Sequence, residues 1–205
     1  MDAAAQIEPR STALVLNDLQ LAIISNSPLA PSEAEAVTRF NSAVLQCAKA
    51  LTAARRVGMH VVHVRVAFSA GYAEANLHSP MMRFIREKEL LLDGAPATAF
   101  DPRVEPDAAE IVITKRGVSA FSGTALDEAL RARGVSAVVL GGLVAHYAVE
   151  GTAREAHDRG YRVLVLKDAC ASATVSRYDA AVANLAFLGE VLTTEAFLGR
   201  LGGTS

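Results

Sequence analysis

Strand-like apolar runs alternate with helix-period segments along most of this chain, and no other feature constrains the fold as strongly. Most of the runs are short, rich in β-branched residues and continuously apolar, which is typical of strands buried on both faces of a parallel sheet. The expected strands are Thr12–Asn17, Met59–Val66, Ile111–Lys115, Ala137–Gly141, Arg162–Lys167 and Val191–Thr194. The expected helices are Ser32–Arg56, Pro80–Leu92, Thr124–Arg133, Tyr147–Arg159 and Ser176–Leu188. Repeated strand–helix–strand units require right-handed crossovers, so the pattern predicts a three-layer α/β/α, Rossmann-like fold with a mostly parallel sheet of about six strands.

Arginine and glycine mark the joints at which three expected helices lead into strands. The chain reads Arg56-Val57-Gly58, Arg133-Gly134 and Arg159-Gly160 at these points. A cation in the last helical turn interacts favourably with the helix dipole, and glycine adopts at low cost the left-handed conformation that ends a helix. Because no linker-like segment separates these units, we expect a single domain over residues 1–205.

The composition favours a large buried core and disfavours two classes of partner. Hydrophobic residues make up 51% of the 205 residues, which excludes a disordered chain. The 20 Lys and Arg residues are offset by 22 Asp and Glu residues, so no basic excess is present to bind a phosphate backbone, and we expect no nucleic-acid partner. Apolar runs such as Ser136–Val144 are much shorter than the roughly 18 residues of a membrane span, so we expect no membrane association.

The cysteines and the first residues indicate a reducing compartment. Cys47 and Cys170 form neither a metal-ligand spacing nor a disulfide framework, and we interpret both as small buried hydrophobic residues. The segment Met1–Arg10 contains Asp2 and Glu8 and lacks the basic and apolar regions of a secretory signal. We therefore expect a cytoplasmic location.

Four polar residues follow expected strands: Asp18, Lys115, His146 and Asp168. Open parallel sheets bind their ligands beyond the carboxyl ends of the strands. Alone, Asp18 could be a turn residue and Lys115 could extend to solvent. Together at one edge of the sheet, a carboxylate and an ammonium shift each other's pKa and form a proton-transfer pair. We interpret Asp168, in contrast, as a residue that fastens its loop.

The segment Gly141–Val149 leads from a strand of small residues into the N-terminus of a helix. Such a turn directs backbone N–H groups and the positive end of the helix dipole toward an anion, including the oxyanion of a reaction intermediate. The alternative is ordinary packing of a helix on a sheet, for which Gly141 and Gly142 are sufficient.

A long irregular stretch, Ala67–Glu110, separates the second and third expected strands. Stretches of this length between regular elements usually cover or line a site. We expect its loops to form the substrate pocket. Its apolar residues Tyr72, Met81, Met82 and Phe84 are expected either in a lid or in a subunit interface.

Three blocks of the chain, in this order, carry specific motifs: Asp18-Leu19-Gln20, then Thr114–Thr124, then Gly142 with Thr152–Ala156 and Gly160–Val163. They resemble the isochorismatase-like hydrolases, a superfamily that includes isochorismatase, nicotinamidase and N-carbamoylsarcosine amidohydrolase. The resemblance covers nearly the whole chain and implies a small-molecule substrate, no cofactor and a homodimer or homotetramer. The zinc-binding Asp-x-His of nicotinamidase-like members is not seen, since His60 and His63 precede the irregular stretch and His78 stands alone, so we expect no metal.

The resemblance also implies the positions of a catalytic triad. Asp18 matches the aspartate that serves most members as general base, and Lys115 matches the lysine that orients it and stabilises charge. The third member is a cysteine at the start of the helix after the fourth strand, where this chain has Ala148. Because alanine has no nucleophilic atom, a covalent thioester route through this position is closed.

Five further residues are expected to contact the substrate: Gln20, Val144, Ala145, His146 and Tyr147. Members of the superfamily tend to have a cis peptide shortly before the nucleophile, and the resemblance places it here between Val144 and Ala145. Such a strained bond turns backbone amides toward an oxyanion.

Three functions remain open on these residues. The first is a hydrolase without a thiolate, which isochorismatases proper resemble: they have glycine at the cysteine position and an Ala-His pair like Ala145-His146. In those enzymes the aspartate handles the proton that cleaves a vinyl ether. By analogy Asp18 would be the acid, with a pKa raised by burial. The second is a cysteine-type amidohydrolase, which cleaves C–N bonds, with its nucleophile replaced by Ala148. The third is a small-molecule-binding homologue that has kept the fold and lost the chemistry.

Overall fold

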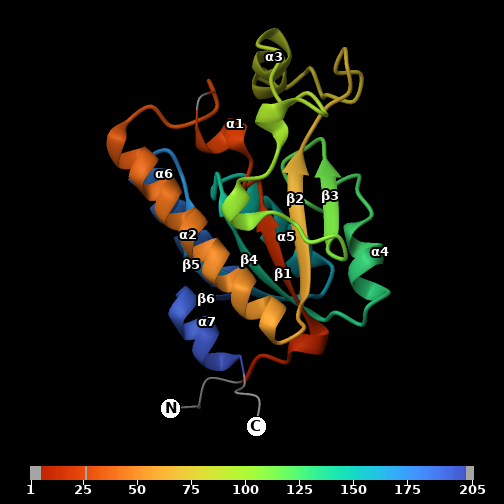
Figure 1. Ribbon diagram of the computed structural model, residues 1–205, viewed down its shortest axis with the longest axis vertical. Helices are drawn as coiled ribbons and strands as arrows, with labels where there is room; N and C mark the ends of the chain where they lie inside the picture. Colours follow the sequence, from red (N-terminus) through yellow and green to blue (C-terminus); the bar gives the residue numbers. More distant parts are fainter. Residues whose placement is uncertain (1–5, 26, 202–205) are drawn as a thin grey trace.

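Six parallel strands form one sheet in the computed structural model, which describes residues 6–25 and 27–201. Their order is β3-β2-β1-β4-β5-β6, and every neighbouring pair is parallel (Figure 1). The strands are β1 (Thr12–Asn17), β2 (His60–Val66), β3 (Ile111–Lys115), β4 (Ala137–Leu143), β5 (Arg162–Ala171) and β6 (Glu190–Leu192). The three-layer α/β fold expected from the periodicity is confirmed, and the sheet is parallel throughout these strands. Residues 1–5, which hold part of the segment examined for a leader, lie outside the described residues.

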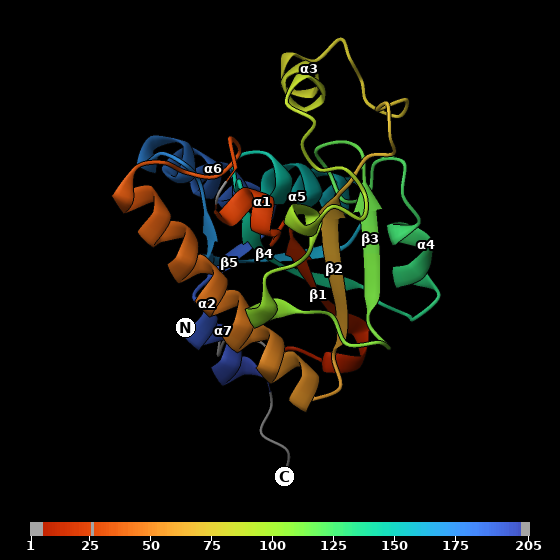
Figure 2. The same ribbon diagram turned by 45° about the horizontal axis from the view of Figure 1, so that its top comes forward.

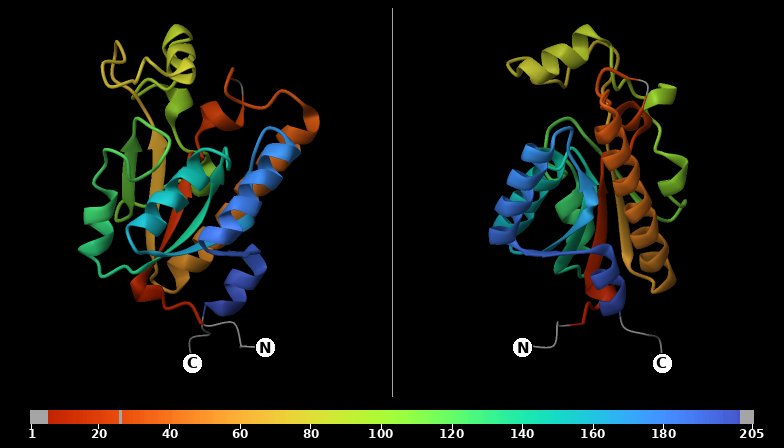
Figure 3. Two further views of the ribbon diagram at one scale, coloured as in Figure 1. Left: turned by 180° about the vertical axis from the view of Figure 1, so that it is seen from behind. Right: turned by 90° about the vertical axis from the view of Figure 1, so that its left-hand side faces the viewer.

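Helices cover both faces of the sheet (Figure 3). Helices α2 and α7 pack on one face, and α4, α5 and α6 pack on the other. The α-helices are α1 (Leu21–Ile24), α2 (Ala34–Arg56), α3 (Pro80–Glu87), α4 (Leu126–Arg131), α5 (Ala148–Asp158), α6 (Val175–Leu188) and α7 (Thr194–Arg200), with short 3-10 turns at Pro9–Ser11, Pro96–Thr98 and Pro102–Val104. No helix in the described part of the chain combines the length and apolarity that crossing a membrane requires.

The apolar stripe of α2 determines which side of the helix faces the sheet. Phe40, Val44, Cys47 and Leu51 recur at intervals of three and four residues, and all are buried in the core between α2, α7 and the sheet. On the opposite face, Cys170 lies in the core beneath α4, α5 and α6. Burial raises the pKa of the Cys47 thiol, and raises the pKa of Cys170 to about 12, so both behave as the buried hydrophobic residues predicted.

The C-terminal part of the chain differs from the sequence expectation. We expected a strand at Val191–Thr194, but β6 ends at Leu192. Helix α7, which the periodicity did not predict, follows it. Thr193 caps this helix, and the Thr193 side chain accepts a hydrogen bond from the Ala196 N–H at 3.2 Å. Strand β5 also runs four residues further than expected and includes Asp168. The Asp168 carboxylate accepts hydrogen bonds from the N–H and the hydroxyl of Thr194 at 2.7 and 2.9 Å, so it does fasten this region, to the start of α7.

The strand order reverses direction between β1 and β4, which places their carboxyl ends side by side. Asn17, the last residue of β1, is in register with Gly142 of β4. Gly142 has a φ of +138°, and a Cβ atom added there would lie 2.1 Å from the Asn17 carbonyl oxygen. Glycine is therefore required at this point, since no side chain fits between the two backbones. The consequence is close approach of Asp18, which follows β1, to the turn that follows β4.

We predict that Gly142→Ala destabilises the fold by about 3 kcal/mol, because the added Cβ meets backbone atoms and the positive φ disfavours an L side chain. The change is measured as a loss in the free energy of unfolding by urea. Gly199→Ala is the control, because a Cβ at Gly199 in α7 meets nothing within 4 Å, and alanine there is expected to change stability by less than about 1 kcal/mol. Equal effects of the two substitutions would contradict the close approach of β1 and β4.

Candidate active site

A cavity of about 200 Å³ lies at the carboxyl ends of β1, β3 and β4. Helix α3 lies above this end of the sheet and stands apart from the layered body (Figure 2). The cavity lining combines one carboxylate and one ammonium with an otherwise largely apolar wall: Asp18, Ile23, Leu29, Val66, Met81, Met82, Ile85, Leu91, Lys115, Gly117, Val118, Val144, Tyr147 and Ala148. The cavity is therefore at the site that the topology of an open parallel sheet favours for ligands.

Asp18 and Lys115 form a buried ion pair in the wall of this cavity. The Lys115 Nζ lies 3.0 Å from Asp18 Oδ2, and the two side chains are 1% and 7% exposed, respectively. Asp18 has a φ of +58°, and its N–H donates a hydrogen bond to the Val64 carbonyl at 2.9 Å, which anchors the turn after β1 to strand β2. The Lys115 ammonium also donates to the Val118 carbonyl at 2.7 Å. Lys115 is thus held by a carboxylate on one side and a carbonyl on the other.

The Asp18 carboxyl has one oxygen in use and one without a partner. Its Oδ1 is buried and makes no hydrogen bond within the described part of the chain. Burial raises the pKa of Asp18 above the ordinary value of 3.8, while the charge and hydrogen bond of Lys115 act in the opposite direction and lower it. A carboxyl whose pKa is raised in this way is suited to donate a proton to a bound molecule and to take one back.

Ala148 is the first residue of α5, and its methyl group lines the same cavity. This is the position at which the resemblance implied a cysteine, so the side chain there offers no nucleophilic atom. Three of the neighbouring amides are engaged within the protein. The N–H groups of Tyr147 and Ala148 donate to the Val144 carbonyl at 2.8 and 3.0 Å, and the Ala145 N–H donates to the Ala171 carbonyl at 2.8 Å.

The backbone before α5 differs from what the resemblance implied. The peptide bond between Val144 and Ala145 is trans, and Val144 has a φ of +54°. The expectation that this turn directs its amides at a ligand is therefore not met by residues 145, 147 and 148, whose N–H groups are all engaged within the protein. Packing of α5 on the sheet, with small residues at Gly141 and Gly142, accounts for the turn.

The other expected contact residues divide into two groups. Val144 and Tyr147 line the cavity, whereas Gln20, Ala145 and His146 do not. The Gln20 amide is fully buried, donates to the carbonyls of Val66 and Thr98 at 2.9 Å each, and accepts from the Val66 N–H at 2.7 Å.

Gln20 therefore ties the turn after β1 to the loop before β3 and to the end of β2. His146 lies beside the cavity wall, with its Nδ1 2.9 Å from the Ser172 hydroxyl. Burial and the charge of Arg177 lower the pKa of His146, so the neutral imidazole is favoured.

Much of the apolar wall comes from the irregular stretch between β2 and β3. Met81, Met82 and Ile85 come from α3 and Leu91 from the loop that follows it, all within the irregular stretch expected to form the pocket. Leu29, from the segment between β1 and α2, was not anticipated at all. Its only sequence signal was its apolar character in a loop otherwise made of Ser, Pro and other small or polar residues.

The histidines that were considered as metal ligands lie elsewhere. His63 is buried on the α2 side of β2, and its Nε2 lies 2.9 Å from Glu110 Oε2. Glu110 is also paired with Arg55, and although burial alone would raise its pKa, these partners lower it to about 2. Within residues 6–25 and 27–201, no group of three or more His, Cys, Asp or Glu side chains is arranged to hold a metal ion.

The fold and the buried ion pair at the switch point define a candidate small-molecule site in an open parallel α/β sheet, and comparison with known proteins gives the family. The isochorismatase domain model matches residues 12–196, so the chain belongs to the isochorismatase family and is a hydrolase. It is similar to the ureidoacrylate amidohydrolase RutB of Acinetobacter baylyi, with 31% identity over 95% of this chain and 85% of that protein.

Two solved structures extend this comparison. An isochorismatase family protein of Desulfovibrio vulgaris is 29% identical, with a TM-score of 0.82 over 94% of this chain and 98% of that one. The N-carbamoylsarcosine amidase of Thermoplasma acidophilum is 27% identical, with a TM-score of 0.73 over 90% and 97% of the two chains. The resemblance inferred from the three motif blocks is confirmed at the level of the family.

We predict that Lys115→Met lowers the free energy of unfolding by about 3–5 kcal/mol at neutral pH, because it leaves the Asp18 carboxylate buried without its counter-ion. The folded-state pKa of Asp18 is already above 3.8 and rises further in the variant. A carboxyl whose pKa is higher in the folded than in the unfolded chain stabilises the fold while it is protonated. This contribution is fully present below pH 3.8, the ordinary pKa, and is lost as the pH rises through the folded-state pKa.

The loss caused by Lys115→Met is therefore expected to be smaller at acidic pH than at neutral pH, as measured by denaturant unfolding at several pH values. Arg116→Met is the matched control, since Arg116 is the adjacent cation and pairs with Glu74 at the surface. A loss that is independent of pH would show that Lys115 acts only through packing.

Proposed function

We propose that this protein hydrolyses a small organic molecule by acid–base chemistry, with Asp18 as the proton-transfer group and Lys115 as the residue that positions it. The observation that carries this proposal is the buried pair of Asp18 and Lys115 in the wall of a cavity where Ala148 stands in place of a nucleophile. The engaged amides of Tyr147 and Ala148 support the same conclusion, because acyl transfer needs free donors at the oxyanion.

In this proposal each group has one task, written here for a vinyl ether. The protonated Asp18 carboxyl gives its proton to the outer vinyl carbon, and water adds to the oxocarbenium carbon that results while one of its protons returns to the Asp18 carboxylate. The hemiketal then collapses: its C–O bond to the alcohol breaks, its hydroxyl proton passes to the departing oxygen, and a ketone and an alcohol leave. Lys115 stabilises the carboxylate while the proton is on the substrate, and its bonds to Asp18 Oδ2 and the Val118 carbonyl leave Oδ1 as the reacting oxygen. Isochorismatases proper, which also lack the cysteine, cleave a vinyl ether in this general way, and this supports the assignment.

A second candidate function is hydrolysis of an amide or carbamoyl C–N bond, with the nucleophile of an ancestral cysteine enzyme replaced by Ala148. The similarity to a ureidoacrylate amidohydrolase and to an N-carbamoylsarcosine amidase favours it. In that case Asp18 would act as a base, and the present chain would bind its substrate without turning it over efficiently. A homodimer or homotetramer, as the resemblance implies, remains part of the proposal for either function.

We predict that Asp18→Asn lowers kcat by about 10²–10⁴-fold, because an amide transfers no proton at this position. The assay uses a panel of isochorismate, carbamoyl compounds and simple amides, with products detected by mass spectrometry. Asp168→Asn is the control, since it alters a carboxylate that is not part of the cavity wall. Unchanged turnover in Asp18→Asn would remove the acid–base role, and ligand binding without turnover in the native chain would identify a binding protein.

The pH profile distinguishes an acid from a base at Asp18. A proton donor is active below its pKa, so we predict that kcat falls as pH rises through the raised pKa of Asp18. Stopped assays across the acidic and neutral range measure this limb. A rate that instead falls as the solution becomes more acidic would support the base role of the amidohydrolase candidate.

Substitution of Ala148 tests the two candidates directly. We predict that Ala148→Cys does not create amidase activity, because the N–H groups of Tyr147 and Ala148 are already engaged by the Val144 carbonyl and no oxyanion site awaits the thiolate. Ala148→Gly is the matched control without a thiol and is expected to keep the native activity. A gain of turnover on amides in Ala148→Cys alone, abolished by iodoacetamide, would favour the amidohydrolase candidate.

A further inference from the structure

We infer that the molecule bound in this cavity is uncharged and consists of a small head group that can donate a hydrogen bond, joined to an apolar body. The inference rests on the proposed function only in taking the cavity at Asp18 as the substrate site. It is drawn from three features of the wall: its apolar side chains, the engagement of its one ammonium, and the unpartnered oxygen of Asp18.

Apolar side chains line most of the rest of the cavity. They come from α1 and the segment after it, from α3 and its following loop, and from the segments after β3 and β4: Ile23, Leu29, Met81, Met82, Ile85, Leu91, Val118 and Val144. A ligand surrounded by them gains by burying apolar surface. The volume of about 200 Å³ is below the 300–1,000 Å³ or so typical of sites for drug-sized ligands, so the body is limited to about one ring or a short alkyl chain.

The cavity offers no free cation to a carboxylate or phosphate. Lys115 is the one cation in the described lining, and it is engaged by Asp18 and by the Val118 carbonyl. The adjacent Arg116 is directed away from it, since it bonds to the Thr114 carbonyl at 3.0 Å and lies 3.8 Å from Glu74.

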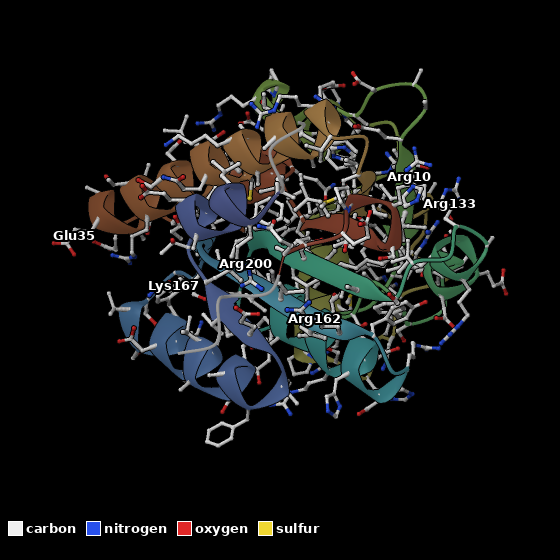
Figure 4. All side chains as sticks on the ribbon, turned by 90° about the horizontal axis from the view of Figure 1, so that it is seen from below. Arg10, Glu35, Arg133, Arg162, Lys167 and Arg200 are labelled. Carbon is white, nitrogen blue, oxygen red and sulfur yellow. The ribbon has the colours of Figure 1, made fainter. Side chains whose placement is uncertain are left out.

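Several other cations lie at the far end of the molecule. Arg133, Arg162 and Arg200 appear at the amino ends of the strands, in the view from below (Figure 4), whereas the cavity is at the carboxyl ends. An anionic group carried into the cavity on the substrate would lose its hydration without gaining a counter-ion. The wall therefore selects against charged ligands.

The head group is indicated by Asp18. Its Oδ1 is buried and lacks a partner within the described residues, and such an oxygen is costly to leave unsatisfied. When Asp18 is ionised, Oδ1 needs a donor, and when it is protonated, its O–H needs an acceptor. Amides and hydroxyl groups meet both demands, whereas a carboxylate meets only the second: it has no proton to donate to the ionised Oδ1 and would face it with like charge. The ligand is thus oriented with its polar head at Asp18 and its body toward Met81, Met82 and Ile85 of α3.

Matched pairs of ligands test this inference with the full chain. Benzamide and benzyl alcohol represent the two head groups, and 4-carboxybenzamide and 4-(hydroxymethyl)benzoate are the same molecules with an ionised carboxylate on the body. Dissociation constants are measured by isothermal titration calorimetry at neutral pH. We expect each neutral compound to bind at least about tenfold more tightly than its carboxylated partner. Equal or tighter binding of the carboxylated compounds, or no binding of either neutral compound, would overturn the inference.

Two variants of α3 test whether the cavity wall is what selects neutral over charged ligands. Met81 and Phe84 are each 37% exposed and lie one helical turn apart, but only Met81 lines the cavity. The preference is the ratio of the dissociation constants of the carboxylated and neutral ligands. We expect Met81→Arg to lower this ratio by at least about tenfold, because the new arginine supplies the missing counter-ion, and we expect Phe84→Arg to leave the ratio unchanged. An unchanged preference in Met81→Arg, or the same shift in both variants, would contradict the assignment.

These outcomes separate the inference from the proposed function. Selective binding of neutral ligands with no turnover of any substrate would contradict the acid–base hydrolase and leave the inference intact. Turnover of a carboxylated substrate that disappears in Asp18→Asn would support the hydrolase and overturn the inference.

Discussion

The buried ion pair between Asp18 and Lys115 is the interaction on which the rest of this site depends. Two charges removed from water can lose more in hydration than their attraction recovers, so the pair itself adds little net stability, although removing one partner leaves the other charge buried and is costly. Here one carboxyl oxygen is bonded to the ammonium, and the other is buried without a partner in the described part of the chain. The proposed function rests on this difference between the two oxygens of a single residue.

The topology of the sheet makes this pairing possible. Asp18 follows β1, Ala148 begins the helix after β4, and Lys115 ends β3, so three crossovers converge on one edge of the sheet. Strand β2 lies between β1 and β3, and the long lysine side chain spans it to reach the aspartate. The close backbone approach at Gly142 brings the turn after β4 against the end of β1. A parallel sheet with a different strand order would keep these residues at the same end of the sheet but could separate them by more strands.

The sheet and the meeting of Asp18 with Lys115 at its carboxyl end could be predicted from sequence because both follow local rules. Continuous apolar runs, period-3.6 patterns and the Arg-Gly joints define the elements, and the carboxyl ends of parallel strands meet by geometry. The position of α3 and the contribution of Leu29 depend on packing between distant segments, which no local pattern reports. The direction of the amides after β4 depends on the backbone of Val144, whose positive φ is uncommon for a β-branched residue.

In the proposed function, the selection of the substrate and the raised pKa of Asp18 both follow from the apolar surroundings of this carboxyl. Burial is the largest cause of the raised pKa of Asp18, and the side chains that line its cavity are mainly apolar. An apolar ligand that displaces water from this space keeps the surroundings of the carboxyl weakly polar, so the proton donor retains its raised pKa while the substrate is bound. A charged ligand would bring water or a counter-ion with it and change that pKa. In the proposed mechanism, the same apolar wall would therefore both select the ligand and help to keep Asp18 protonated.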